Sequence, residues 1–324
     1  MVRIELRSEL DQEVLAQILE LIEAAARIEG HRPVGEHKYS HLRVGAQGWT
    51  GVLAYDRQRL VGYAHTRWNA VGERPRMAVE VVVHPEYYGR DVARRLLGEV
   101  RTVLTRAGGG LLYLWVHRVQ DAATTLAARL GFHVQREIAF MSRELSGPPA
   151  SPPLPRGISL RPYRVDVDDE EFLRVNNAAF AGHPENGDWD RAELAERRRL
   201  DWFDPDGLIM AWRGDELVGF HWTKWHGHDS DDLPAHEPVG EVYVLAVHPD
   251  AQHLGLGRLL LTAGLRYLHE RGCRLAILYV DCASNDAVRL YESEGFRLRY
   301  KDVCYQDWVE PIADQPASDL LRPA

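Results

Sequence analysis

The chain has 324 residues, of which 45% are hydrophobic and 27% charged, and this length and composition favour a globular protein of two domains. Its 39 basic and 48 acidic residues give a net charge of −9, which argues against a general nucleic-acid-binding surface. Three cysteines, all in the C-terminal half, argue against a disulfide framework. Because no apolar run approaches the ~18 residues of a membrane span and the N-terminus is charged, we expect a cytoplasmic protein with no membrane contact.

Both halves of the chain predict the same series of elements. An amphipathic helix comes first, then a hairpin and a β-branched strand. A glycine turn, a helix, a strand, a second helix and a last strand follow. This series is typical of a mixed α/β sandwich with a local βαβ segment. The first three elements lie at residues 11–28, 51–68 and 79–83 in one half and at residues 169–181, 207–225 and 242–247 in the other.

An internal repeat accounts for the duplication. His84-Pro85 corresponds to His248-Pro249, and Phe132 of LAARLGF corresponds to Phe296 of LYESEGF, with the same offset of 164 residues. One offset kept across nearly fifty residues implies one supersecondary unit used twice. The proline-rich segment 146–157 suits a stiff linker. We therefore expect an N-terminal domain at 1–145, a C-terminal domain at 158–312 and a frayed tail at 313–324.

The turn QHLGLG, residues 252–257, joins a predicted strand to a predicted helix. Gly255 and Gly257 let backbone N–H groups approach an anion, and the helix dipole adds its positive end, so the turn suits a pyrophosphate. It matches neither the Walker motif nor the dinucleotide fingerprint. Taken alone, such a turn more often only starts a packed helix.

The context of this turn resembles the GNAT N-acetyltransferase family. A strand followed by V-x4-Q-x2-G-x-G, with N-x-A-V-x-L-Y-x3-G-F about thirty residues later, is present in outline in both halves. The resemblance implies two tandem GNAT-fold domains that use acetyl-CoA as co-substrate and no metal. One position departs from the pattern, because Ser284 stands where asparagine is expected. The acetyl-CoA contacts that the resemblance implies are Leu245, Ala246, Val247, Gln252, His253, Leu254, Gly255, Leu256, Gly257, Arg258, Ser284, Asn285, Asp286, Ala287, Val288 and Arg289, with Val81, Val82, Val83, Gly89, Arg90 and Ala93 as doubtful contacts in the N-terminal domain.

Four longer motifs, at 176–189, 202–212, 217–226 and 240–249, resemble a two-domain branch of the family. Members of this branch acetylate the cysteinyl amine of a cysteine-glucosamine-inositol conjugate. The resemblance implies small-molecule partners, and we expect a monomer. Surface charge is the alternative interpretation of each acceptor contact that it implies, namely Glu36, Glu185, Lys224, Glu241 and Tyr279.

The chemistry of acetyl transfer indicates what the site must contain. An amine that is mostly protonated at neutral pH needs a base, and the departing thiolate needs a proton. Glu241 opens the strand before the turn and is our candidate base; the alternative is an exposed strand-end carboxylate. Tyr291 is the candidate acid that the resemblance implies; the alternative is an aromatic core residue. A backbone N–H near Leu245 is the simplest oxyanion donor, and Cys282 is not needed as a nucleophile.

The N-terminal copy serves as an internal control. The offset of 164 places Met77 at the position of Glu241, Ala127 at that of Tyr291 and Asp91 at that of Gly255. This copy therefore lacks the base and the acid, and it should not catalyse. Whether it binds CoA stays open, because Asp91 would repel a pyrophosphate unless its carboxylate turned outward.

The sequence leaves two alternative functions open, and its histidines raise the question of a metal site. The chain is alternatively an acetyltransferase for another amine, such as an aminoglycoside, or a non-catalytic acyl-CoA-sensing module. The histidines at 221, 226, 228 and 236 lack the paired spacing of a metal site, so we expect a solvated loop there.

Overall fold

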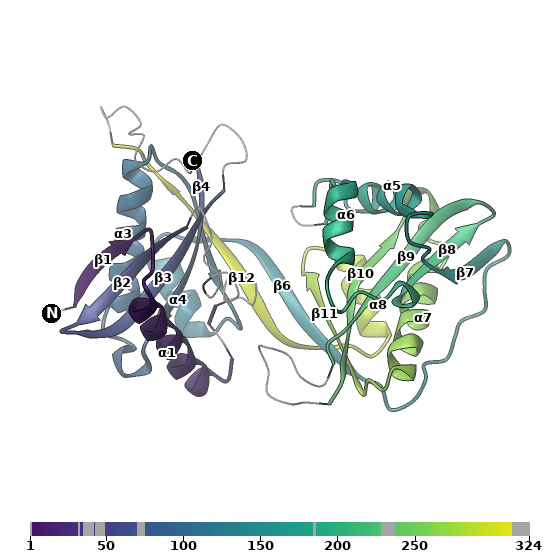
Figure 1. Ribbon diagram of the computed structural model, residues 1–324, viewed down its shortest axis with the longest axis horizontal. Coiled ribbons are helices and arrows are strands. Elements are labelled where there is room, and N and C mark those ends of the chain that lie inside the picture. Colours follow the sequence, from purple (N-terminus) through teal and green to yellow (C-terminus); the bar gives the residue numbers. More distant parts are fainter. Residues whose placement is uncertain are drawn as a thin grey trace. The chain divides into compact units, whose positions relative to one another are not determined.

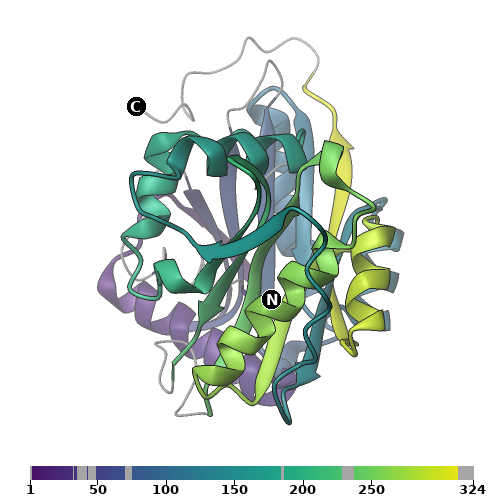
Figure 2. The same ribbon diagram turned by 90° about the vertical axis from the view of Figure 1, so that its right-hand side faces the viewer.

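The computed structural model describes residues 2–31, 33–34, 42, 49–69, 75–183, 186–227 and 237–312. The chain divides into two compact units, unit 1 (Met1–Ile138 with Tyr300–Ala324) and unit 2 (Ala139–Arg299). Each unit is a sheet with helices on both faces (Figures 1 and 2). In the described part of the chain, every helix is too short or too polar to cross a membrane. The predicted tail at 313–324 lies outside the described residues.

Unit 1 has the strand order β1-β2-β3-β4-β5-β12. Helix α1 (Gln12–Glu29) covers one face of this sheet, and α3 (Val92–Arg106) and α4 (Asp121–Arg129) cover the other. Asp11 caps the start of α1 by accepting from the N–H of Val14. The strands are β1 (Arg3–Arg7), β2 (Trp49–Asp56), β3 (Arg59–Asn69), β4 (Arg76–Val83), β5 (Gly110–Val116) and β12 (Arg297–Val309).

Unit 2 repeats this arrangement with the order β6-β11-β10-β9-β8-β7. Helices α5 (Asp169–Ala179) and α6 (Arg191–Arg198) pack on one face, and α7 (Leu256–Glu270) and α8 (Asn285–Ser293) pack on the other. The predicted mixed α/β sheet, present twice, is confirmed, because β4–β5 and β10–β11 are parallel pairs among antiparallel ones. The strands are β6 (His133–Glu144), β7 (Ile158–Pro162), β8 (Leu208–Arg213), β9 (Glu216–Trp225), β10 (Val239–Val247) and β11 (Leu275–Asp281).

The last strand of each repeat contributes to the other unit. Strand β6 follows α4 in the chain, yet its residues Ala139 and Met141 are buried in the core of unit 2 with Leu278. Strand β12 follows α8, yet its segment Val303–Val309 pairs antiparallel with β5 of unit 1. Residues 139–145 of the expected N-terminal domain therefore belong to unit 2, and residues 300–312 of the expected C-terminal domain to unit 1. Strand propensity predicts a strand but not the edge that it joins, so the sequence pattern cannot reveal this exchange.

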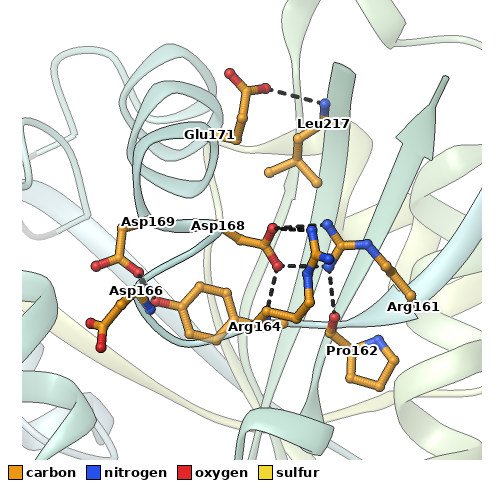
Figure 3. Close-up of polar contacts among 9 residues, drawn as sticks. Arg161, Pro162, Arg164, Asp166, Asp168, Asp169, Glu171 and Leu217 are labelled. Carbon is orange, nitrogen blue, oxygen red and sulfur yellow. Dashed lines mark hydrogen bonds and ion pairs between the residues drawn. The ribbon is translucent and has the colours of Figure 1, made fainter. Parts of the chain in front are cut away.

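The start of α5 is held by a buried carboxylate (Figure 3). Asp168, whose side chain is 2% exposed, accepts from Arg161 at 2.6 and 2.8 Å and from the backbone N–H of Arg164 at 2.7 Å. Burial opposes ionisation, but the hydrogen bonds from the two arginines outweigh it and lower the pKa of Asp168 to about 2. One turn further along, Glu171 accepts from the N–H of Leu217 in β9 at 3.2 Å, which fixes α5 on the sheet.

Candidate active site

Strands β10 and β11 separate part of the way along their length. Their parallel pairing covers only Val239–Glu241 of β10, opposite Leu275–Ile277, whereas β9 accompanies β10 as far as Val247. In the described residues, the β11-facing edge of β10 beyond Glu241 has no strand partner. Free N–H and C=O groups on such an edge can pair with an extended ligand. The structure therefore places Leu245, Ala246 and Val247 on an open edge, next to the glycine turn.

A β-bulge at Tyr243 changes which side chains face the two helical layers. The β9–β10 register shifts between Val242 and Val244. Val242 packs in the α7 core, whereas Tyr243 and Val244 both face the core under α5 and α6. The bulge thus places side chains from neighbouring positions on one side of the sheet, where Glu241 also lies.

The glycine turn joins a strand to a helix, as predicted, through two left-handed residues. Gly255 has φ 76° and His253 has φ 63°, both in the left-handed region, and α7 starts directly afterwards at Leu256. No side chain caps this helix start within the described residues, so its first N–H groups remain available to an anion. Gly257 lies against α8, because a Cβ there would come 3.3 Å from Leu290.

The charged side chain after this turn points to α8. The Arg258 Nε lies 2.9 Å from Glu294 Oε1, and its terminal nitrogen donates to Ser293 Oγ at 2.9 Å. Helix α8 begins at Asn285, one residue after Ser284. Among the expected thioester contacts, Ala287 and Val288 are half-buried against the core, and Ser284, Asn285, Asp286 and Arg289 are exposed.

The candidate base Glu241 lies at the last residue of the β10–β11 pairing and is hydrogen-bonded to a histidine. Its Oε2 lies 2.7 Å from Nε2 of His226, and the two side chains are 12% and 19% exposed. Lys224 stands directly opposite Glu241 on β9, so the two side chains share a face of the sheet. The base is thus neither fully exposed nor isolated.

The other acceptor contacts that the resemblance implies are partly assembled. The Lys224 Nζ lies 5.2 Å from the ring centre of Trp202, and that ring lies 4.7 Å from the ring of Tyr243. The parallel register places Tyr279 on the same face of the sheet as Glu241; it is 49% exposed and contacts Phe140. Glu36 and Glu185 lie outside the described residues.

Tyr291 lies in the core of unit 2. It is 7% exposed and its ring lies 5.8 Å from that of Phe296. Burial raises the pKa of its phenol, which keeps the hydroxyl protonated. A protonated hydroxyl is what a proton donor requires, and it is equally what a packed tyrosine has.

Three side chains near Glu241 were not predicted. The sequence pattern predicts a solvated loop at His226 and indicates no role for Trp202 or Tyr243. The alternation of side chains along β9, continued by one residue beyond Trp225, would have placed His226 on the same face as Lys224. His228 and His236 lie outside the described residues, and the described residues contain no group of three potential metal ligands.

Unit 1 contains a cavity at the corresponding place. Its volume is about 530 Å³, and Asp91 lies at its edge with φ 61° in the left-handed conformation of Gly255. The carboxylate is 66% exposed and pairs with Arg94 at 3.0 Å; that hydrogen bond lowers the pKa of Asp91. The carboxylate therefore points into solvent. Of the doubtful contacts, Val81, Val82, Val83, Gly89 and Ala93 line the cavity, whereas Arg90 lies over the ring of Tyr87 at 5.3 Å.

Comparison with known proteins assigns the chain to a family. The Acetyltransferase (GNAT) family matches residues 15–132 and 172–296. The mycothiol acetyltransferase of Acidothermus cellulolyticus is 40% identical over 315 residues, which cover 94% of both chains, and that of Rhodococcus opacus is 44% identical over 303 residues, which cover 91% of this chain and 95% of the relative.

Two solved structures share the fold. One is a GCN5-related N-acetyltransferase from Sphaerobacter thermophilus, with a TM-score of 0.70 and 20% identity over 96% of this chain and 98% of that one. The other is a tandem GNAT protein from the clavulanic acid biosynthesis pathway, with a TM-score of 0.69 and 20% identity over 97% of this chain and 100% of that one. The chain therefore belongs to the GNAT acetyltransferase family and, within it, to the mycothiol acetyltransferases.

Proposed function

We propose that unit 2 transfers the acetyl group of acetyl-CoA to the cysteinyl amine of desacetylmycothiol, the cysteine-glucosamine-inositol conjugate, and so forms mycothiol and CoA. The observation that carries this proposal is the position of Glu241. Its carboxylate lies where β10 leaves β11, at the start of the open strand edge that leads to the glycine turn. All the proposed groups belong to one chain, and the reaction needs neither a metal nor a second copy.

The proposed reaction is direct transfer in a ternary complex. Glu241 accepts a proton from the ammonium, and the free amine attacks the thioester carbonyl. A backbone N–H near Leu245 stabilises the oxyanion. When the C–N bond is complete, the C–S bond breaks and the CoA thiolate takes the proton of Tyr291. The new amide nitrogen then gives up its extra proton, a proton from solvent restores the Tyr291 hydroxyl, and Glu241 releases its proton to solvent.

The test is acetyl-CoA consumption followed as free-thiol release. Desacetylmycothiol is offered beside cysteine, glucosamine and an aminoglycoside, each at the same concentration. Turnover confined to the conjugate supports the proposal. Preference for another amine would leave the chemistry standing and remove the substrate assignment. CoA binding without turnover of any amine would favour the sensing module.

We also propose that unit 1 binds CoA without turnover. The cavity and the exposed Asp91 support binding. The bulge in β10 shifts the expected correspondence by one residue, so Ala78, not Met77, pairs with β5 as Glu241 pairs with β11. Neither Ala78 nor Ala127 can act as a base or an acid, which argues against catalysis. Calorimetry should find two CoA sites per chain. Asp91→Gly should strengthen one site and Gly255→Asp should weaken the other; a single site abolished by Gly255→Asp contradicts this proposal.

A further inference from the structure

We propose that His226 is a positioning residue that holds the carboxylate of Glu241 for proton removal from the acceptor amine. This inference rests on the proposed function of unit 2. It concerns a side chain that the acetyl-transfer scheme above does not use.

Two hydrogen bonds, one from the side chain and one from the backbone, hold His226 against β10. Its side chain reaches Glu241 at 2.7 Å, and its backbone N–H donates to the carbonyl of Val239 at 2.9 Å. Val239 and Glu241 are two residues apart on β10, so the histidine is anchored to the same strand that carries the carboxylate. Both side chains are less than a fifth exposed, which shields the hydrogen bond from competing water.

The chemistry of the two side chains determines which of them donates the hydrogen bond. A carboxylate only accepts, so Nε2 of His226 carries the proton and donates it to Oε2 of Glu241. One oxygen is thereby occupied and oriented, and Oε1 is left to meet the amine.

Other charged groups also face Glu241. Lys224 stands opposite it on β9. Tyr243 interacts electrostatically with it, and Tyr243 is in turn within reach of Arg197 and Glu193 of α6. None of these residues changes when His226 is replaced, so a change in kcat can be assigned to the histidine.

The experiment compares three variants by steady-state kinetics across pH. His226→Leu removes the donor, His226→Gln retains an amide donor near the Nε2 position, and His133→Gln, at an exposed site on β6, is the matched control. We expect kcat of His226→Leu to fall roughly 10- to 100-fold, below the ~10⁴-fold upper range for loss of a whole general base. KM for acetyl-CoA should stay unchanged. His226→Gln should recover most of kcat.

Two outcomes overturn the inference. His226→Leu could keep the wild-type kcat. Alternatively, His226→Gln could lose as much activity as His226→Leu, which would indicate that the imidazole relays the proton or only packs.

A second measurement separates this inference from the proposed function. NMR of the His226 ring nitrogens in the wild type and in Glu241→Gln reads the pair without turnover, and the Nε2 signal should move. A wild type that acetylates no amine but shows this shift would remove the proposed function and leave a structural pair. An active wild type without the shift would remove only the inference.

Discussion

At the scale of single residues, Tyr291 combines a packing role with a proposed chemical one. Tyr291→Phe removes the hydroxyl and keeps the ring against Phe296. We expect kcat to fall ~10²-fold or more, because the thiolate would leave unprotonated, while the free energy of unfolding changes by only about 1 kcal/mol. Stopped-flow thiol release and urea unfolding on the same samples test both expectations. Unchanged kcat would assign Tyr291 to the core alone.

His221 is the second residue that deserves a test, because it is fully buried. Its Nδ1 donates to the carbonyl of Leu260 at 2.9 Å, and a Cβ on Gly264 would lie 2.1 Å from its ring. Burial lowers the pKa of His221 to about 4, below the ordinary 6.5. Below pH 6.5, His221 binds a proton in the unfolded chain but stays neutral in the folded chain.

His221 should therefore make the protein less stable as pH falls from 6.5 to 4. The lost free energy of unfolding should reach about 3 kcal/mol at pH 4. His221→Gln, which does not titrate, should show a smaller difference between pH 7 and pH 4.5 in urea unfolding. An equal difference in both proteins would contradict the assignment.

At the scale of elements, the start of α5 depends on the ion pairs of Asp168 (Figure 3). The lowered pKa of Asp168 means that its ionised form stabilises the fold above about pH 4, and this contribution is lost as pH falls towards 2. Asp168→Asn should cost about 2 kcal/mol of unfolding free energy at pH 7, and the cost should shrink below pH 4. Glu170→Gln, exposed on the same helix, is the control and should cost almost nothing. A cost that stays constant with pH would show that the charge is not responsible.

At the scale of the whole molecule, each unit contains the last strand of the other repeat. Val303, Tyr305 and Val309 of β12 are buried in unit 1, and each such side chain stabilises by roughly 1.5–3 kcal/mol. Their loss approaches the ~5–15 kcal/mol that holds a domain together. A fragment of residues 1–145 should therefore fail to fold, although it contains the complete N-terminal repeat.

The repeat itself supplies the control for this prediction. Residue 133 corresponds to residue 297, so residues 1–132 joined directly to 297–312 keep the native register at the junction. This fragment should fold, as shown by cooperative unfolding and dispersed amide signals. Cooperative folding of residues 1–145 alone would show that β6 can replace β12 at the edge of β5.

The sequence indicates Glu241 and the glycine turn as candidate site residues, but it does not indicate which side chains surround Glu241. Glu241 lies on the strand that leads into the glycine turn, so two motifs that follow one another in the chain indicate both. His226, directly after β9, and Glu241, on β10, are 15 residues apart, and only the β9–β10 register and the bulge decide that their side chains meet. Asp91 shows the same limit, because its spacing predicts a carboxylate in the turn but not its outward direction.

What the sequence by itself determined is local: the duplicated series of elements, the offset of 164, the glycine turn between strand and helix, and an N-terminal copy that has neither a carboxylate nor a tyrosine at the positions of Glu241 and Tyr291. These features depend on side-chain periodicity and on backbone conformations that a few neighbouring residues set. Only the tertiary structure decided that β6 and β12 are exchanged and that His226 supports Glu241. Strands of similar composition can pair at either edge, and the choice between edges depends on hydrogen bonds between segments far apart in the chain.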